Sequence, residues 1–259
     1  MAAELFRLDG KVAVVIGGAG GLGEPIAIGF AQQGAKVVVA SRRLEAVQEV
    51  AEKIRKETGA DAAAFQVDAT NEQSVAQLVE QVVAKFGTVD ILMNAHGTAI
   101  KRPAAEFPLD VWNEQFNLNV NAVMLPCREF GKVMIEKKKG KIINMSSERG
   151  SRVTIWGGNV GYSASKGALE MYTRALASEW APYNINVNGV APSIIRTPLT
   201  ESLGILSEEH LTKYLANCPL KRVGEPQDIV GVTVFLAAPA SDFITGAIIY
   251  LDGGVNIIS

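Results

Sequence analysis

The chain has 259 residues, of which 48% are hydrophobic and 20% are charged, so it is long enough for one large domain with a single core. Twenty-five basic residues against 27 acidic ones give no reason to expect nucleic acid or a membrane surface as a partner. Two histidines exclude a multi-histidine metal site, and two cysteines exclude a disulfide framework. With no apolar run of membrane-spanning length and no signal-like start, we expect a cytoplasmic protein without a bound metal.

Short apolar runs alternate with longer helical segments along the chain. The predicted strands cover residues 11–16, 36–40, 62–67, 90–94, 141–146, 185–191 and 248–251, and the predicted helices cover 21–33, 44–57, 70–86, 110–137, 162–180 and 226–237. Thr70 to Gln73 fits a capping box at the third helix. This alternation predicts one doubly wound α/β domain over residues 1–259, with a parallel seven-stranded sheet covered by helices on both faces. Residues 193–220 have no clear place in that sheet, and we predict that they form a mobile flap over the substrate.

A glycine-rich turn follows the first predicted strand. Residues 17–23 fit two overlapping spacings, G-x-G-x-x-G from Gly18 and G-x-x-x-G-x-G from Gly17. Without Cβ atoms the backbone can approach a phosphate closely, and the amides at the start of the next helix point at the anion. No Gly-Lys-Ser/Thr follows, which excludes a P-loop. The turn therefore predicts a dinucleotide site.

The second predicted strand ends in Ser41-Arg42-Arg43 instead of an acidic residue. An acid at this position accepts hydrogen bonds from the adenosine ribose, whereas arginine matches a 2′-phosphate. We therefore predict NADP(H) as the preferred cofactor, with Arg42 as the main contact and Ser41 assisting, and NAD(H) as the second choice.

Tyr162 and Lys166 lie four residues apart at the start of a predicted helix, and so on one helix face. A nearby ammonium favours the phenolate, so we expect Lys166 to lower the pKa of Tyr162 towards the range of a general acid or base. Asn94 and Ser147 follow neighbouring strands, and Asn119 stands in a helix that does not favour asparagine. Because ligands bind outside the carboxyl ends of parallel strands, these groups should face one crevice.

With these motifs in this order, the chain resembles the short-chain dehydrogenase/reductase family over essentially its whole length. The matching segments are Gly17-x-x-x-Gly21-x-Gly23, Asn94-Ala95-His96-Gly97, Ser147, Tyr162-x-x-x-Lys166 and Asp252-Gly253-Gly254. The resemblance implies a Rossmann-fold homotetramer and a catalytic tetrad of Asn119, Ser147, Tyr162 and Lys166, with Ser146 as the alternative serine. Together with Ser41 and Arg42, the implied cofactor contacts are Gly17, Gly21, Leu22, Gly23, Asp68, Ala69, Asn94, Ala95, Tyr162, Lys166, Pro192, Ile195 and Thr197.

A set of mostly cationic residues after the fourth and fifth strands is expected to line the substrate pocket: His96, Lys101, Arg102, Glu148, Arg149, Arg152 and Trp156. Four fixed cations suit a substrate carboxylate. The runs 146–150 and 179–184 resemble those of sugar-acid and polyol members such as gluconate 5-dehydrogenases. The sequence therefore favours hydride transfer between the nicotinamide cofactor and a secondary alcohol or ketone of a small sugar acid or polyol.

Three other functions fit the sequence less well. A 3-oxoacyl-acyl-carrier-protein reductase would use the same tetrad but would need a basic docking patch. A non-catalytic NADPH sensor would bind the dinucleotide without reducing a carbonyl. A serine hydrolase is disfavoured because the chain has no Gly-x-Ser-x-Gly elbow.

Overall fold

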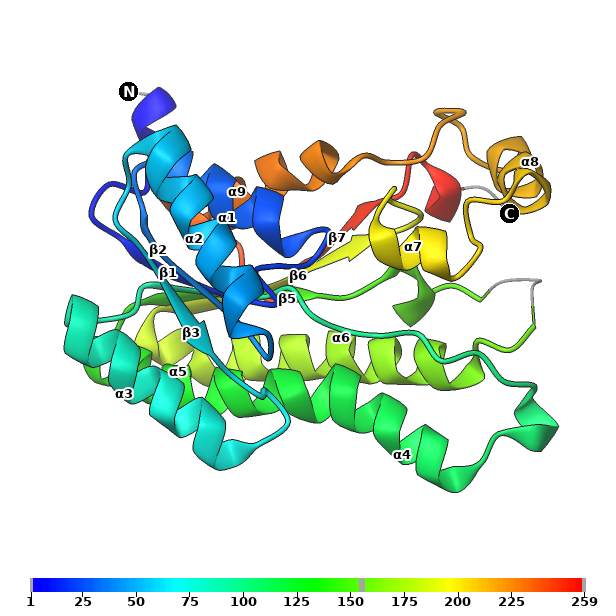
Figure 1. Ribbon diagram of the computed structural model, residues 1–259, viewed down its shortest axis with the longest axis horizontal. Coiled ribbons are helices and arrows are strands. Elements are labelled where there is room, and N and C mark those ends of the chain that lie inside the picture. Colours follow the sequence, from blue (N-terminus) through cyan, green and yellow to red (C-terminus); the bar gives the residue numbers. More distant parts are fainter. Residues whose placement is uncertain (1, 154–156, 258–259) are drawn as a thin grey trace.

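The sequence predicts a parallel seven-stranded sheet, and the structure confirms it, with the strands in the order β3-β2-β1-β4-β5-β6-β7. The structure is a computed structural model that describes residues 2–153 and 157–257 (Figure 1). The strands are β1 (Val12–Ile16), β2 (Lys36–Ser41), β3 (Ala62–Gln66), β4 (Ile91–Asn94), β5 (Gly140–Met145), β6 (Ile185–Pro192) and β7 (Ile248–Leu251). Every residue of β1 is buried, which is why its sequence is almost wholly apolar and β-branched.

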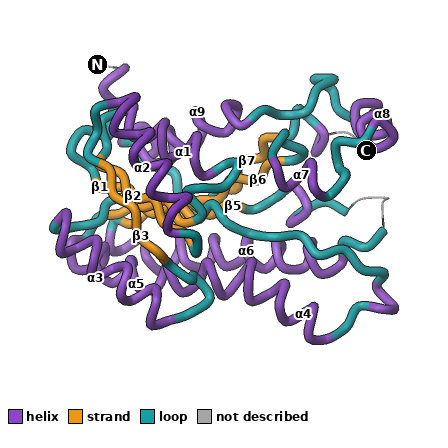
Figure 2. Tube along the Cα trace, viewed as in Figure 1, coloured by secondary structure: helices purple, strands orange, loops and turns teal. Residues whose placement is uncertain are grey.

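Helices cover both faces of the sheet, which lies as one layer between them in Figure 2. The described helices are α1 (Gly23–Gln32), α2 (Leu44–Thr58), α3 (Glu72–Phe86), α4 (Leu109–Phe116), α5 (Ala122–Lys137), α6 (Val160–Trp180), α7 (Pro198–Ser202), α8 (Glu208–Ala216) and α9 (Val230–Ala237). Ala13 and Val15 of β1 pack with α1, α2 and α9, whereas Val12 and Val14 pack with α3, α5 and α6. This alternation gives the molecule two apolar cores, one on each face of the sheet.

The prediction of one long helix over residues 110–137 is wrong, because the structure has two α-helices there. A π-helical turn at Asn117–Asn121 separates α4 from α5. There, Asn119 Oδ1 accepts a hydrogen bond from the Thr98 amide (2.8 Å), and Asn119 Nδ2 donates to the Thr98 carbonyl (2.9 Å) and to Ser165 Oγ (3.0 Å). A polar side chain bonded to two other segments holds the wide turn, and such turns are frequent at functional sites.

The start of α3 also differs from the prediction of a capping box that begins at Thr70. Asn71 is the N-cap, and its side chain accepts a hydrogen bond from the Ser74 amide (2.9 Å). The Thr70 hydroxyl instead donates to Asp68 Oδ1 (2.6 Å). A cap at Thr70 would accept from the Gln73 amide, so the observed cap is one residue further along, and the Thr70 hydroxyl is bonded to the Asp68 carboxylate instead.

Residues 193–220 contain α7 and α8, which lie beyond the carboxyl end of β6 (Figure 1). They pack on a small apolar core of their own that includes Ile194, Tyr214, Cys218 and Val255. None of the described helices has both the length and the hydropathy that crossing a bilayer requires.

Candidate active site

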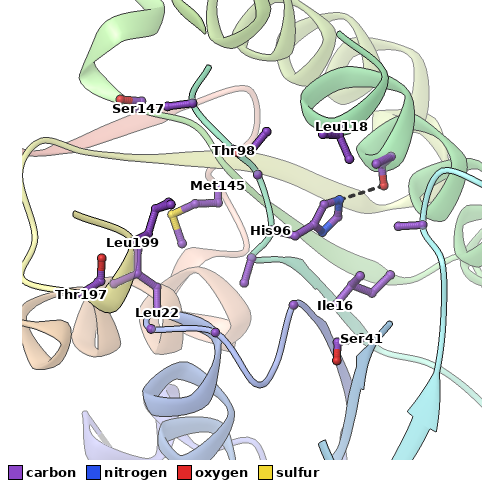
Figure 3. Close-up of a pocket in the computed structure, with 18 of the residues that line it drawn as sticks. Ile16, Leu22, Ser41, His96, Thr98, Leu118, Met145, Ser147, Thr197 and Leu199 are labelled. Atoms are coloured by element: carbon purple, nitrogen blue, oxygen red, sulfur yellow. Dashed lines mark hydrogen bonds between the residues drawn. The ribbon is translucent and has the colours of Figure 1, made fainter. Parts of the chain in front are cut away.

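A cleft of about 1030 Å³ opens along the carboxyl ends of the strands. Its lining joins segments that lie far apart in the chain, and Figure 3 shows residues of β1, β2 and β5, of the loop after β4 and of the segment after β6 facing it. Most of the residues predicted from the sequence line this cleft: Gly17, Gly21, Leu22, Ser41, Arg42, Asp68, Ala69, Ala95, His96, Ser147, Tyr162, Lys166, Pro192, Ile195 and Thr197. Of the predicted cofactor and tetrad residues, Gly23, Asn94 and Asn119 are not among the residues that line it.

The glycine-rich turn is closed tightly on itself. Gly17 has a φ of +82°, a backbone conformation that favours glycine. A Cβ on Gly23 would lie 2.1 Å from the Gly17 carbonyl oxygen, and a Cβ on Gly21 would lie 2.8 Å from Thr197 Cβ. Side chains at these two positions would therefore displace the turn or the flap, and their absence leaves a cradle of backbone at the start of α1. This shape fits the pyrophosphate of a dinucleotide.

Asn94 is a structural residue of the sheet. Its side chain is fully buried, and its Nδ2 donates a hydrogen bond to Asn144 Oδ1 of β5 (2.9 Å). Asn144 in turn donates to Thr173 Oγ1 of α6 (3.0 Å). Asn94 thus joins β4 to β5, and its side chain is not among those that line the cleft.

The end of the cleft at β2 contains charged groups of both signs. Asp68 accepts hydrogen bonds from the Thr70 amide (3.0 Å) and hydroxyl (2.6 Å), which hold the pKa of this carboxyl below its usual value. The Arg42 guanidinium contributes a further lowering of that pKa, so the two side chains lie near each other. Arg42 also lines the cleft, where its guanidinium can meet an anionic group of a ligand.

Tyr162 and Ser147 both line the cleft, and the Ser147 side chain is one of the groups that lower the pKa of the Tyr162 phenol. Ser147 Oγ accepts a hydrogen bond from the Arg149 amide (3.3 Å), which orients its own proton away from that amide. The neighbouring Ser146 donates instead to Glu170 Oε1 (3.2 Å). The geometry therefore favours Ser147 over Ser146 as the partner of Tyr162.

Lys166 lies under the Tyr162 ring, with Nζ 5.9 Å from the ring centroid, and donates a hydrogen bond to the Met145 carbonyl (2.8 Å). Burial lowers the pKa of Lys166 to about 8. Burial also raises the pKa of Tyr162, against the lowering effects of the Ser147 hydrogen bond and the Arg149 guanidinium. The prediction that Lys166 lowers the pKa of Tyr162 is wrong for this structure, because removal of the phenol from water outweighs the nearby charges.

His96 lies beside the glycine turn, on the side of the cleft away from Ser147 (Figure 3). Its Nε2 is 3.0 Å from the Ala122 carbonyl oxygen. Because a carbonyl only accepts, Nε2 carries the proton, and burial lowers the pKa of the ring to about 4. His96 is therefore neutral at pH 7 and is closer to the glycine turn than to the catalytic hydroxyls.

The other residues predicted to line the substrate pocket are not brought together in the cleft. Lys101, Arg102, Glu148, Arg149 and Arg152 do not line it, and Trp156 lies outside the described residues. Glu148 is buried, with its Oε1 3.3 Å from Arg149 Nη2. Glu148 and Arg149 belong to a short 3-10 turn at Glu148–Gly150, and closeness to Ser147 in the sequence does not bring their side chains into the lining of the cleft.

Several lining residues were not predicted from the sequence, among them Thr98, Leu118, Leu199 and Thr200. One local signal was available for Thr200. Thr197 and Thr200 form a reciprocal capping box at α7, with Pro198 at the first helical position. Leu118 and Leu199 have no such signal, because only the tertiary fold turns these apolar side chains towards the cleft.

Comparison with known proteins agrees with this architecture. A family profile described as "Enoyl-(Acyl carrier protein) reductase" matches residues 17–256. The 5-keto-D-gluconate 5-reductase of Escherichia coli (strain K12) is 36% identical over 258 residues, which cover 98% of each chain. The 2-dehydro-3-deoxy-D-gluconate 5-dehydrogenase of Pseudoalteromonas atlantica is 38% identical over 253 residues, covering 97% of this chain and 98% of the relative.

Two further relatives bear on the cofactor. The NAD-dependent glycerol dehydrogenase of Listeria innocua is 35% identical over 254 residues, covering 97% of this chain and 96% of the relative. A gluconate 5-dehydrogenase from Burkholderia cenocepacia J2315, solved in complex with NADP and tartrate, is 30% identical with a TM-score of 0.95, and the match covers 100% of both chains.

The parallel sheet, the glycine turn and the Ser147–Tyr162–Lys166 arrangement define a nicotinamide-dependent oxidoreductase that acts on CH–OH groups. The chain belongs to the short-chain dehydrogenase/reductase family, so the resemblance noted in its sequence is confirmed.

Proposed function

We propose that this protein interconverts a secondary alcohol and a ketone on a sugar acid or polyol, with NADP(H) as its preferred cofactor. The observation that carries the proposal is that Ser147, Tyr162 and Lys166 line one cleft that is large enough for a dinucleotide and a small substrate. Relatives of this chain are named as oxidoreductases of keto-gluconates and of glycerol, and these names support a sugar acid or polyol as the substrate.

In the direction of ketone reduction, Tyr162 donates its proton to the substrate oxygen. Burial keeps that proton on the phenol at neutral pH, so the hydroxyl is ready to act as an acid. Ser147 donates a hydrogen bond to the same oxygen and stabilises the charge that develops on it. When bound, the nicotinamide ring supplies the hydride.

Lys166 and Asn119 would assist the proton transfer by Tyr162 and Ser147. A Cβ on Gly97 would lie 3.1 Å from Lys166 Nζ and 3.2 Å from Asn119 Oδ1, so both groups converge on one point of the β4 loop. The Lys166 ammonium would bind the nicotinamide ribose and replace the proton that Tyr162 gives away. Asn119 would hold a water in that relay.

The cofactor fits the cleft as a dinucleotide. The backbone cradle at Gly17, Gly21 and Leu22 would hold the pyrophosphate, and Asp68, Ala69 and Ala95 would contact the adenosine. Pro192, Ile195 and Thr197 would hold the nicotinamide amide. Arg42 with Ser41 would bind a 2′-phosphate, which is the basis for NADP(H) over NAD(H). The NADP complex of the Burkholderia relative supports this choice.

We also propose that the protein is a homotetramer in the cytoplasm. Large apolar side chains are exposed on the described surface, with Phe243 fully exposed, Ile257 84%, Leu220 64% and Met171 62% exposed. Exposed apolar groups of this size are typical of surfaces that another chain covers. They support assembly through α6 and through the C-terminal segment.

The test is a panel of sugar acids, polyols, acyl thioesters and simple ketones, assayed with NADPH and NADH by absorbance at the nicotinamide band. We expect turnover of the polyhydroxylated compounds, and activity on acyl thioesters alone would favour the acyl-carrier-protein reductase. Tyr162→Phe should lower kcat by at least about 10²-fold and leave the Kd for NADPH unchanged. Substantial turnover by Tyr162→Phe would contradict the assigned acid, and tight NADPH binding with no turnover of any compound by the unmodified protein would favour a sensor.

A further inference from the structure

A buried glutamate on α6 contacts the same strand end as the catalytic lysine. Tyr162, Lys166 and Glu170 follow one another at intervals of four residues, so their side chains leave the helix on neighbouring parts of one face. Lys166 Nζ donates a hydrogen bond to the Met145 carbonyl (2.8 Å), and Glu170 Oε1 accepts one from the Ser146 hydroxyl (3.2 Å). The end of β5 is therefore bonded to α6 at two successive residues.

Both carboxylate oxygens of Glu170 have partners, although the residue is only 2% exposed. Besides the Ser146 bond at Oε1, Oε2 accepts a hydrogen bond from the Tyr250 hydroxyl of β7 (3.2 Å) and lies 3.5 Å from Arg174 Nη2. Burial of a carboxylate costs free energy, which charge pairing and hydrogen bonds offset. Because these bonds are directional, they fix the end of β5 more closely than apolar packing would.

Glu170 also contacts the chain on the other side of Ser147. A Cβ on Gly150 would lie 2.5 Å from Glu170 Oε1 and 2.8 Å from Glu170 Cδ, so the 3-10 turn that ends at Gly150 packs directly on this carboxylate. The Gly150 amide in turn donates a hydrogen bond to the Ser147 carbonyl (2.9 Å). Glu170 therefore borders the catalytic serine in both chain directions, through Ser146 before it and through Gly150 after it.

We propose that Glu170 is a positioning residue for Ser147. Its bond to Ser146 and its contact with Gly150 hold the Ser147 hydroxyl where it can meet the same substrate oxygen as Tyr162. Glu170 does not line the cleft, so it acts through its neighbours and not on the substrate or the cofactor. A displacement of about 1 Å in a catalytic group can cost about 10²-fold in rate. The inference rests on the proposed function, to which it adds a residue that sets the geometry of the active site.

The experiment measures kcat and KM of the full-length enzyme with NADPH and the compound of the substrate panel that the unmodified enzyme reduces fastest. Glu170→Ala should lower kcat roughly 10- to 100-fold, because a misplaced Ser147 stabilises the substrate oxygen less well. KM and the Kd for NADPH should change less than about twofold, because Glu170 touches neither ligand. Glu170→Gln keeps an oxygen that accepts from the Ser146 hydroxyl and should retain kcat within about fivefold of the unmodified enzyme.

Thr173→Val is the matched control. Thr173 is 1% exposed on the same helix, and its hydroxyl accepts a hydrogen bond from Asn144 of β5 (3.0 Å). The variant therefore also removes a buried bond between α6 and β5, but three residues away from Ser147 and not beside it. Its kcat should equal that of the unmodified enzyme. Ser146→Ala breaks the Glu170 bond from the other side, so the losses of Ser146→Ala and Glu170→Ala should not add in the double variant.

An unchanged kcat in a folded Glu170→Ala protein would overturn the positioning role and leave the proposed function intact. Additive losses in the double variant, or an equal loss in Thr173→Val, would overturn it too, because either result indicates a general loss of packing. An unmodified protein that reduces no compound of the panel would reject the proposed function together with the positioning role. If Glu170→Ala does not fold, Ser146→Ala removes the same bond through a single atom, and an unchanged kcat there would overturn the proposal.

Discussion

The tightest contact in the glycine turn gives the most direct test of the dinucleotide site. In Gly23→Ala the added methyl would lie 2.1 Å from the Gly17 carbonyl oxygen, 2.8 Å from the Gly17 carbonyl carbon and 2.9 Å from Gly18 Cα. All three atoms are backbone, so the strain cannot be relieved by rotating a side chain. The Gly17 carbonyl also accepts a hydrogen bond from the Gly20 amide (3.0 Å), and its displacement therefore distorts the whole turn.

Overpacking of this kind costs about 1–3 kcal/mol of folding free energy. For a domain of this length, that corresponds to a fall in Tm of roughly 2–10 °C. If the distorted turn also loses one amide hydrogen bond to the pyrophosphate, the Kd for NADPH should rise roughly 10- to 100-fold. Thermal unfolding measures the first effect, and calorimetric titration with NADPH measures the second.

Gly231→Ala supplies the control, because Gly231 also stands in the first turn of a helix and nothing lies within 4 Å of its added methyl. This variant should be as stable as the unmodified protein or more stable by up to about 1 kcal/mol, with the same Kd for NADPH. A Gly23→Ala protein with an unaltered Tm and an unaltered Kd would refute the contact argument and the placement of the phosphate.

Two further predictions concern charge. Arg42→Asp should raise the KM for NADPH roughly 10- to 100-fold and the KM for NADH far less; steady-state kinetics that leave the ratio of the two unchanged would contradict the 2′-phosphate assignment. Burial lowers the pKa of His96 from 6.5 to about 4. Between these pH values the unfolded chain binds more protons than the folded one. His96 should therefore make the protein less stable as the pH falls from 6.5 towards 4. In urea titrations across this range, the free energy of unfolding of His96→Ala should therefore depend less steeply on pH than that of the unmodified protein; identical slopes would show that His96 does not contribute.

Much of the fold and part of the cleft follow from local sequence patterns. The apolar run at residues 11–16 predicts a strand buried on both faces, and β1 is buried throughout. Glycines at 17, 21 and 23 predict a turn that side chains would obstruct, as the close contacts at Gly21 and Gly23 show. The spacing of Tyr162 and Lys166 places them on one face of α6, because helical periodicity is a property of a few consecutive residues.

The tertiary structure alone decided how these groups are paired and how far they are removed from water. The π-helical turn at Asn117–Asn121 depends on the bonds of Asn119 to Thr98 and Ser165, which are distant in the chain. Burial, which no local pattern reveals, determines that the pKa of Tyr162 rises and not falls.

Glu148 shows the same limit most clearly. The sequence places it one residue from Ser147, but its burial, which raises the pKa of its carboxyl, and the nearby charge of Asp252, 104 residues further along the chain, follow from the fold. Hydrogen-bond spacing and helix periodicity act between near neighbours and can be read from the sequence. Desolvation and charge–charge interaction act through space, so they are determined only when the folded chain brings distant residues together.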